Sequence, residues 1–402
     1  MKKILFAAML AAVAAGCQND DIYGSVEEFE EAYATAETED EVKSITIDTS
    51  SLSETDVVVT DSTDAAYNDY VENSSFDRTV YIYYKGDTAT IEGATDYVTA
   101  TVSGAHVEMN ATKKHICYVL SGTTSDGSFK VYSERKFEIM LNGVTIANPS
   151  GAAINNQCGK TLYIVLADGT TNSLSDSGTY STPNGEKEKG TLYSDGQIVF
   201  SGTGRLNVYG NVKNGIASDD YIRFRPGVNI YVAATAGNGI KVNDGIYLDG
   251  GVINVETTAD GAKGINCESF VKVAGGRTTV ITSGTSAIEG SDTTNVAAMK
   301  CDSAYVQTAG IVRLKSTGSS AKGLNCNTSI TMSGGELSVV TTGEKDYSAP
   351  KGIKCDSDAT FTGGTTYSYS ANSRPLDVGG TLTVGSTATT NSTDTNPVVI
   401  AF

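Results

Sequence analysis

Acidic and amide side chains recur at one position of a short motif in the C-terminal half of the chain. The motif has the form Asn/Lys-Gly-Ile/Leu followed by two more residues, and the recurring side chain comes next. The residues at this position are Asp219, Asn243, Glu268, Asp302, Asn327 and Asp356. If successive motifs stack as neighbouring strands, about 5 Å apart, their carboxylates repel one another. A cation between them removes that repulsion.

Ligand sets made only of oxygen are typical of calcium sites, because Ca²⁺ accepts many oxygen ligands in flexible geometry. The densest group pairs Asp219-Asp220 with Asn243-Asp244 of the next motif. We therefore predict that Ca²⁺ is the cofactor. The predicted ligands are Asp219, Asp220, Asn243, Asp244, Asp260 and Glu268. The alternative is structural, since stacked amides also hydrogen-bond from one strand to the next.

Basic side chains recur beside the acidic ones. Two of them, Lys241 and Lys263, are candidates for a catalytic base. Beside calcium, a lysine with a lowered pKa can abstract the proton α to a uronate carboxylate, which is the chemistry of a polysaccharide lyase. The simpler interpretation is that these lysines pair with the acidic row on a solvated surface.

Tyrosines in the same region are candidates for contact with sugars, whose axial C–H faces are apolar and stack on aromatic rings. Tyr247 falls in an outward row with Arg223 and Lys272, whereas Tyr305 falls in an apolar row and is expected in the core. The predicted carbohydrate-binding residues are Tyr247, Arg223, Lys241 and Lys272.

A repeat must position these side chains. The fifth residues of seven successive motif copies are 218, 242, 267, 301, 326, 355 and 378, at spacings of 24, 25, 34, 25, 29 and 23. A second marker, in most copies Gly-Gly, lies eight and nine residues after the first six of these positions. The stretches around the markers alternate between apolar and polar residues, as in Ile253-Asn254-Val255. Such alternation predicts short strands separated by turns.

A period of roughly 25 residues with about three short strands and no helix predicts the coils of a parallel β-helix. Leucine-rich repeats have a similar period, but their Leu/Asn signature is absent. A β-sandwich gives no reason for two markers to keep register over successive copies. The fold class is therefore all-β. Strands before Asn214, such as Leu162–Leu166, are expected to form earlier and less regular coils.

The repeat also assigns an inward face. The first inward row comprises Ile216, Ile240, Ile265, Met299, Leu324, Ile353 and Leu376. The second comprises Ser218, Val242, Cys267, Cys301, Cys326, Cys355 and Val378. We expect the four cysteines to be buried thiols, because in-line stacked side chains rarely reach disulfide geometry. A straight ladder of thiols also cannot form a tetrahedral metal site.

Charge is concentrated in one part of the chain. Of the formal net charge of −18, residues 17–75 carry −16, from 17 acidic residues and one lysine. The rest of the mature chain is near balance. A pI near 4.5 argues against nucleic-acid binding, which requires a surplus of basic residues. With 2 His in the chain, a zinc site built from histidines is excluded.

The N-terminus is typical of an exported lipoprotein. Residues 1–16 have a basic start, an apolar stretch too short to span a bilayer, and Ala15-Gly16 before Cys17. We predict that 1–16 is a signal peptide and that lipidated Cys17 anchors the protein to a membrane without spanning it. The acidic residues that follow resemble an export signal to the outer-membrane surface. We expect 17–75 to form an acidic tether or an N-terminal cap.

Several segments between about 98 and 263 resemble a family of secreted bacterial β-helix proteins, the carbohydrate-binding domain-containing proteins. These segments are Val119–Gly122, Leu141–Ile146, Thr170–Asp176, Phe200–Val208 and Gly215–Asp220. The resemblance implies a right-handed parallel β-helix over 76–402, calcium binding, and affinity for cellulose-like or acidic polysaccharides. Asp219 and Asp220 match the family's Ser-Asp-Asp step. Gly237–Ile240 departs from the Asp-Asp-Gly-Ile common in the family, and Asp260-Gly261 is the nearest acidic substitute.

The leading hypothesis is a monomeric surface lipoprotein that binds polysaccharide through a calcium-bearing face of the β-helix, without catalysis. One alternative is a calcium-dependent lyase of the pectate type that uses Lys241 or Lys263 as its base. Another is a structural adhesin or surface spacer, which requires only the solenoid.

Overall fold

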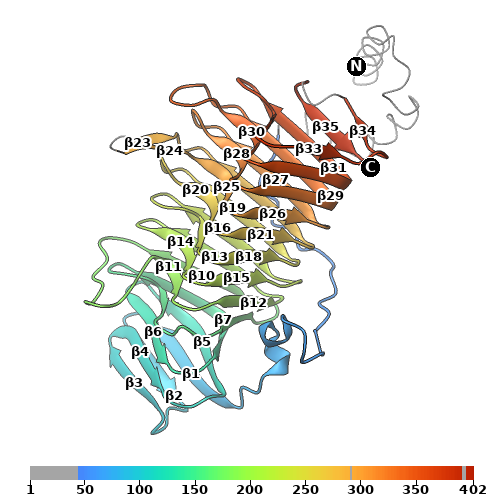
Figure 1. Ribbon diagram of the computed structural model, residues 1–402. Helices are drawn as coiled ribbons and strands as arrows, with labels where there is room; N and C mark the ends of the chain where they lie inside the picture. The colour runs from blue at the N-terminus through green and yellow to red at the C-terminus, as the bar shows by residue number, and fades with distance from the viewer. Residues whose placement is uncertain (1–43, 290–291, 392–394) are drawn as a thin grey trace, which may run out of the picture.

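The computed structural model describes residues 44–289, 292–391 and 395–402. Its strands stack into a long solenoid, and the chain passes in each turn through three columns of parallel strands (Figure 1). The predicted parallel β-helix is confirmed. We call the three columns faces 1, 2 and 3, in the order in which the chain visits them. No helix in the described part of the chain is long and apolar enough to cross a membrane.

Face 1 contains the repeated Gly-Ile motif. Its 12 strands are β3 (Val98–Ser103), β4 (Ala105–Ala111), β6 (Gly127–Ser133), β8 (Ile154–Asn156), β11 (Gly190–Ser194), β14 (Asn214–Ser218), β17 (Ile240–Val242), β20 (Lys263–Cys267), β25 (Ala297–Cys301), β28 (Lys322–Cys326), β30 (Lys351–Cys355) and β32 (Leu376–Val378). Between β20 and β25 the chain makes a hairpin of β23 (Ala287–Glu289) and β24 (Asp292–Thr294).

Face 2 follows face 1 in each turn. Its strands are β1 (Arg78–Lys85), β5 (Ile116–Thr124), β7 (Phe137–Asn148), β9 (Leu162–Leu166), β12 (Ile198–Gly202), β15 (Tyr221–Phe224), β18 (Gly245–Leu248), β21 (Phe270–Val273), β26 (Ala304–Gln307), the first parts of β29 (Ser329–Thr341) and β31 (Asp358–Ser370), and β33 (Leu382–Val384).

Face 3 completes the turn. Its strands are the second parts of β5 and β7, then β10 (Thr171–Asp176), β13 (Arg205–Gly210), β16 (Asn229–Ala234), β19 (Val252–Thr257), β22 (Arg277–Thr282), β27 (Ile311–Ser316) and the second parts of β29 and β31. Antiparallel strands cover the ends of the stack, where an open edge would otherwise invite further pairing. β2 (Thr88–Glu92) pairs with β1, and β35 (Val398–Ala401) pairs with β31 and with β34 (Thr389–Thr390).

The two inward rows predicted for face 1 are confirmed. Ile216, Ile240 and Ile265 are in register on successive strands and fully buried. The row continues in register through Leu376. Two residues further along the same strands, cysteines 267, 301, 326 and 355 stack on one another. They are no more than 1% exposed and are free thiols. Tyr305 is also fully buried, as its apolar row predicts.

The second marker is a turn between faces 2 and 3. Its second glycine has a positive φ in every copy, from +70° at Gly276 to +92° at Gly227. Backbone in this left-handed region costs glycine little and other residues considerably more. The marker therefore keeps its period because every coil bends in the same conformation at this corner.

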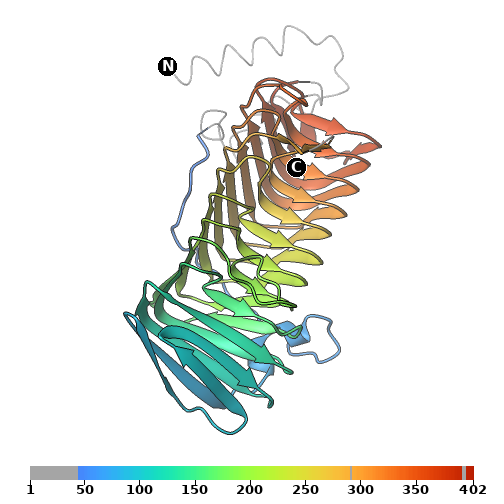
Figure 2. The ribbon, with the colours of Figure 1, turned by 90° about the vertical axis from the view of Figure 1, so that its left-hand side faces the viewer.

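The described part of the acidic N-terminal segment lies against the solenoid. Residues 44–75, which we call the strap, run past faces 3 and 2 outside the coils (Figures 1 and 2). The strap has two short 3₁₀ helices near its end, η1 (Tyr67–Asp69) and η2 (Val71–Asn73), and no strand. Its first part lies near β29 and β31 and its last part near β9 and β15. The strap thus runs opposite to the direction in which the coils follow one another.

Candidate functional site

An aromatic ridge lies on the outer surface of face 2. Tyr247 of β18 lies between Tyr221 of β15 and Phe270 of β21, with ring centroids 5.7 and 5.3 Å apart and both contacts edge-to-face. Tyr221, Gly245 and Phe270 are aligned on three adjacent strands, with Gly245 in the middle. A Cβ atom at Gly245 would lie 2.5 Å from the Phe270 ring, so the missing side chain makes room for that ring. Three half-buried rings thus form a continuous surface across three coils.

Two cations flank the ridge. The Arg223 guanidinium lies 4.1 Å from the centroid of the Tyr247 ring. The Lys272 ammonium lies 5.5 Å from Tyr247 and 4.8 Å from Phe270. Cations over aromatic faces are attracted by the ring quadrupole. Lys272 is exposed and forms no ion pair with any described residue, so its charge is available to a ligand.

Arg223 is in a different electrostatic setting from Lys272. It is 9% exposed and forms ion pairs with Asp249 of face 2 and with Asp69 of η1, the latter at 2.9 Å. Burial raises the pKa of both carboxyls, and the positive charge of Arg223 opposes that shift. Asp69 also accepts a hydrogen bond from the Tyr221 hydroxyl. The strap therefore contributes a carboxylate directly to the edge of the ridge.

Three of the four predicted carbohydrate-binding residues come together at the ridge. Arg223, Tyr247 and Lys272 are in register on adjacent strands of face 2, as their spacing predicts. The fourth, Lys241, lies on β17 of face 1 and pairs with Glu268 at 3.2 Å. Strand order explains the difference, because Lys241 precedes the corner between faces 1 and 2 and Tyr247 follows it.

The predicted calcium ligands do not all converge. Asp219 pairs with Lys187 at 2.7 Å and with Lys189, and it accepts a hydrogen bond from the Tyr193 hydroxyl at 3.1 Å. These partners hold the pKa of Asp219 below its usual value, against the effect of burial. Its carboxylate is therefore already neutralised by lysines of the polar segment before β11.

The remaining predicted ligands differ in their surroundings. Glu268 pairs with Lys241, and Asp260 accepts hydrogen bonds from the backbone and hydroxyl of Thr285. Burial raises the pKa of Asp220, and the negative charge of nearby Asp244 adds to that shift. Within the described residues, no group of three or more His, Cys, Asp or Glu side chains is placed to hold a metal ion. Asp220 and Asp244 are thus the two predicted ligands whose negative charges act on each other in the structure.

If calcium binds this chain, we expect it to bind between Asp220 and Asp244 on the corner of faces 1 and 2. Adding Ca²⁺ to Asp220→Asn should then give a binding isotherm at least about tenfold weaker than wild type, because one charged ligand is lost. Isothermal titration calorimetry measures the Ca²⁺ affinity of the wild type and of the variant. Asp260→Asn is the control, since its carboxylate is distant in the register and occupied by Thr285. Equal affinity in all three proteins would contradict this placement.

The candidate base residues of the lyase alternative are both on face 1. Lys241 pairs with Glu268, and Lys263 donates a hydrogen bond to the Gly261 carbonyl at 2.9 Å. The described lysine whose pKa falls furthest is Lys322, where burial, helped by the charges of Lys354 and Lys351, lowers it to about 8. Lys322 is 4% exposed and away from the ridge. No observation at the ridge favours proton abstraction by a lysine.

Sequence reasoning missed Phe270, Asp249 and Asp69 as members of the site. Phe270 follows Glu268-Ser269 in the repeat, and its alignment with Tyr221 through Gly245 was available in the register. Asp69 had no such signal, because its contact with Arg223 spans 154 residues of chain. Cys17, the predicted lipidation site, lies outside the described residues.

A family model described as "Carbohydrate-binding domain-containing protein" matches residues 103–377 of the chain. A solved structure described as the polysaccharide lyase-like protein from C. thermocellum, a gadolinium derivative, is similar to it, with a TM-score of 0.41 and 19% sequence identity. That alignment covers 77% of this chain and 98% of the other. No protein among the curated sequences matches the chain.

Proposed function

The chain belongs to the family of carbohydrate-binding domain-containing proteins, and from that premise we propose that it binds a polysaccharide along the aromatic ridge of face 2. The observation that supports this most directly is the run of three rings, Tyr221, Tyr247 and Phe270, with the exposed Lys272 ammonium over two of them. The proposed role is binding without catalysis.

The ridge suits a chain of sugar rings for two reasons. Half-buried aromatic rings provide apolar surface to the C–H faces of pyranoses at little entropic cost, since the rings are held by their neighbours. The exposed Lys272 ammonium can pair with a carboxylate, as in a uronate polymer. Both cellulose-like and acidic glycans can use the rings, and acidic glycans can use the lysine in addition.

We further propose that lipidated Cys17 holds the protein on the outer membrane and that the solenoid is displayed at the cell surface. Calcium bound between Asp220 and Asp244 would lie one corner away from the ridge and would supply a bridging positive charge to a uronate carboxylate. The residues that contact sugar in this proposal are Tyr221, Tyr247, Phe270 and Lys272.

Affinity electrophoresis in gels containing polysaccharide tests the ridge. We expect Lys272→Ala to weaken retardation by polygalacturonate about tenfold, because one ion pair to the polymer is lost, and to leave retardation by hydroxyethyl cellulose unchanged. Tyr247→Ala should weaken both. Lys241→Ala is the matched control, a lysine of β17 on face 1 that pairs with Glu268.

Thermal denaturation of each variant checks that the solenoid is intact, which we expect for Lys272→Ala because this side chain is exposed. Binding of wild type to neither polymer, or equal losses in the Lys241 and Lys272 variants, would contradict binding at the ridge.

A further inference from the structure

The strap lies over the cationic part of faces 2 and 3, and its carboxylates pair with arginines there. Arg225, which follows β15, donates two hydrogen bonds to Glu72, at 2.8 and 3.0 Å, and pairs with Asp56 at 2.6 Å. Arg277 of β22 pairs with Asp48 at 3.0 Å. These arginines are 1% and 7% exposed, so the strap accounts for both their burial and their charge balance.

Side chains on face 3 also donate hydrogen bonds to the strap backbone. Asn229 of β16 donates to the Thr49 carbonyl and Asn254 of β19 donates to the Asp48 carbonyl, both at 2.9 Å. Arg277 also donates to the Ser50 carbonyl at 2.7 Å. Successive coils of face 3 thus present one hydrogen-bond donor after another to an extended chain that lies along the solenoid axis.

The strap is attached to the solenoid mainly by polar contacts, and its first part buries few apolar side chains. From residue 44 to residue 66, Ile45 alone is buried, in a small cluster with Val340, Tyr367 and Val399. This stretch has no strand pairing with the solenoid. Segments with few buried apolar contacts are the ones that open locally at low free-energy cost. Residues 44–66 of the strap therefore belong to the part of this structure that detaches most easily.

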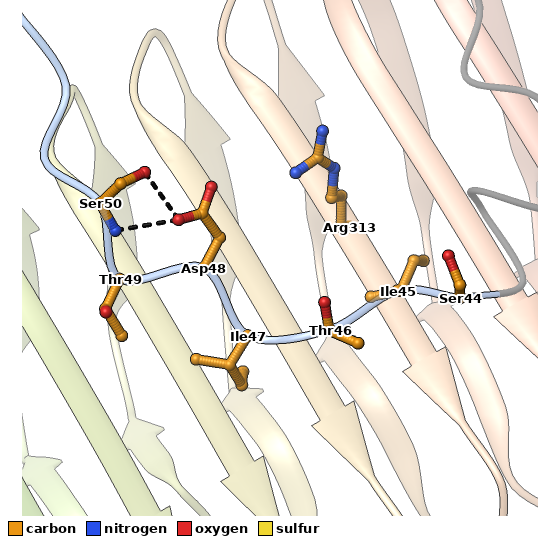
Figure 3. A pocket seen from close by; sticks show the side chains of 8 residues that line it. All are labelled: Ser44, Ile45, Thr46, Ile47, Asp48, Thr49, Ser50 and Arg313. Carbon is orange, nitrogen blue, oxygen red and sulfur yellow. Dashed lines mark hydrogen bonds between the residues drawn. The ribbon is translucent and has the colours of Figure 1, made fainter.

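A hollow lies beside the first part of the strap. Its volume is about 780 Å³, and residues 44–50 line it together with Arg313 of β27. Figure 3 shows the Arg313 side chain extending beside this stretch, with Asp48 turned toward Ser50. A cationic side chain of face 3 thus borders the strap on the side where the hollow opens.

We propose that the surface of faces 2 and 3 under the strap is a second binding site, for an anionic polysaccharide, and that the strap is its intramolecular competitor. The proposal rests on the proposed function and adds to it a class of ligand and a means of regulation. In the closed state Asp48, Asp56 and Glu72 occupy the positions that carboxylates of the polymer take in the open state.

The charge of a polymer decides whether it can displace the strap. A ligand that displaces the strap removes three carboxylates from Arg225 and Arg277 and also removes Asp69 from Arg223. A buried cation without a partner is strongly destabilising. A polyuronate supplies replacement carboxylates, whereas a neutral glucan does not. Neutral polymers are therefore expected to bind at the ridge without moving the strap.

Hydrogen exchange measured by mass spectrometry on the full chain tests the competition. With saturating polygalacturonate, we expect amide exchange within residues 67–74, several of whose N–H groups donate hydrogen bonds in and beside η1 and η2, to rise at least about tenfold, and with hydroxyethyl cellulose to stay unchanged. The double variant Asp56→Asn, Glu72→Gln removes both negative charges from Arg225 and should bind polygalacturonate about tenfold more tightly than wild type. Asp61→Asn is the matched control. Asp61 is an exposed residue of the strap, and its carboxylate accepts hydrogen bonds from the backbone N–H and the hydroxyl of Thr63.

The outcomes separate this proposal from the function on which it rests. Polymer binding that depends on Lys272, with unchanged strap exchange and unchanged affinity in the double variant, would overturn the proposal and leave the ridge as the binding site. Binding that appears only in the double variant would support it. Absence of binding in both wild type and the double variant would overturn both.

Discussion

Replacing Gly318 with alanine is expected to lower the free energy of unfolding by about 3 kcal/mol, at the upper end of what overpacking costs. Gly318 lies in the turn between faces 3 and 1. A Cβ atom there would lie 1.9 Å from the Gly284 carbonyl oxygen and 2.5 Å from its carbonyl carbon. Both are backbone atoms of the preceding coil, so no side-chain rotation relieves the clash.

The clash is repeated along the stack. A Cβ at Gly343 would lie 1.8 Å from the Gly318 carbonyl oxygen, and one at Gly284 would lie 2.0 Å from the Ala259 carbonyl oxygen. Coils at this corner approach one another closely enough that only a hydrogen fits between them. An added methyl group must therefore move one coil away from the next, which weakens the strand pairing on both sides.

Guanidinium denaturation measures the loss, with Gly159→Ala as the control. A Cβ at Gly159 would have nothing within 4 Å, and its φ is not in the left-handed region, so we expect that variant to unfold within about 0.5 kcal/mol of wild type. Equal midpoints for the two alanine variants would show that the corner has room for a methyl group and that the close approach does not contribute to stability.

The sequence predicted the core of this fold because the core repeats. The inward rows through Ile265 and Cys267 recur every 23 to 34 residues, and each copy is in register with its neighbour in the structure. The same reasoning placed Arg223, Tyr247 and Lys272 in one outward row, since residues at equal positions of successive coils must stack. Period and alternation are local properties, so they can be read from the sequence.

Contacts between the strap and the solenoid could not be predicted in this way. Asp69 meets Arg223 across 154 residues, and Asp48 meets Arg277 across 229. The strap has no period and little apolar content, so its sequence is typical of a tether as well as of a bound segment. Its position is set by the arginines of single coils, and other coils have different residues at those positions. The ion pairs of Asp219 with Lys187 and Lys189 likewise could not be predicted, because both lysines lie outside the repeat.

Arg225→Ala is expected to release the strap. The substitution removes the ion pairs to Asp56 and Glu72 and the cation–π contact with Tyr70, at 4.3 Å. Breaking a buried ion pair costs several kcal/mol, but the Glu72 side chain is 46% exposed and solvent screens part of the loss. We expect about 2 kcal/mol, or a roughly 30-fold rise in the hydrogen exchange of residues 67–74, several of whose N–H groups are hydrogen-bonded.

The effect should be confined to the strap, because Arg225 points out of the coil and its neighbour Phe224 is what packs in the core. Exchange in face 1, at β20 and β25, is therefore expected to match wild type. Arg225→Lys keeps the charge but loses the two-pronged contact with Glu72, so it should give an intermediate rise. Arg205→Ala is the control, an arginine of β13 whose side chain bonds Asn207 of its own strand. If residues 67–74 exchange as slowly in Arg225→Ala as in Arg205→Ala, Arg225 does not hold the strap, and its other contacts, including those with Arg223 and Arg277, are sufficient.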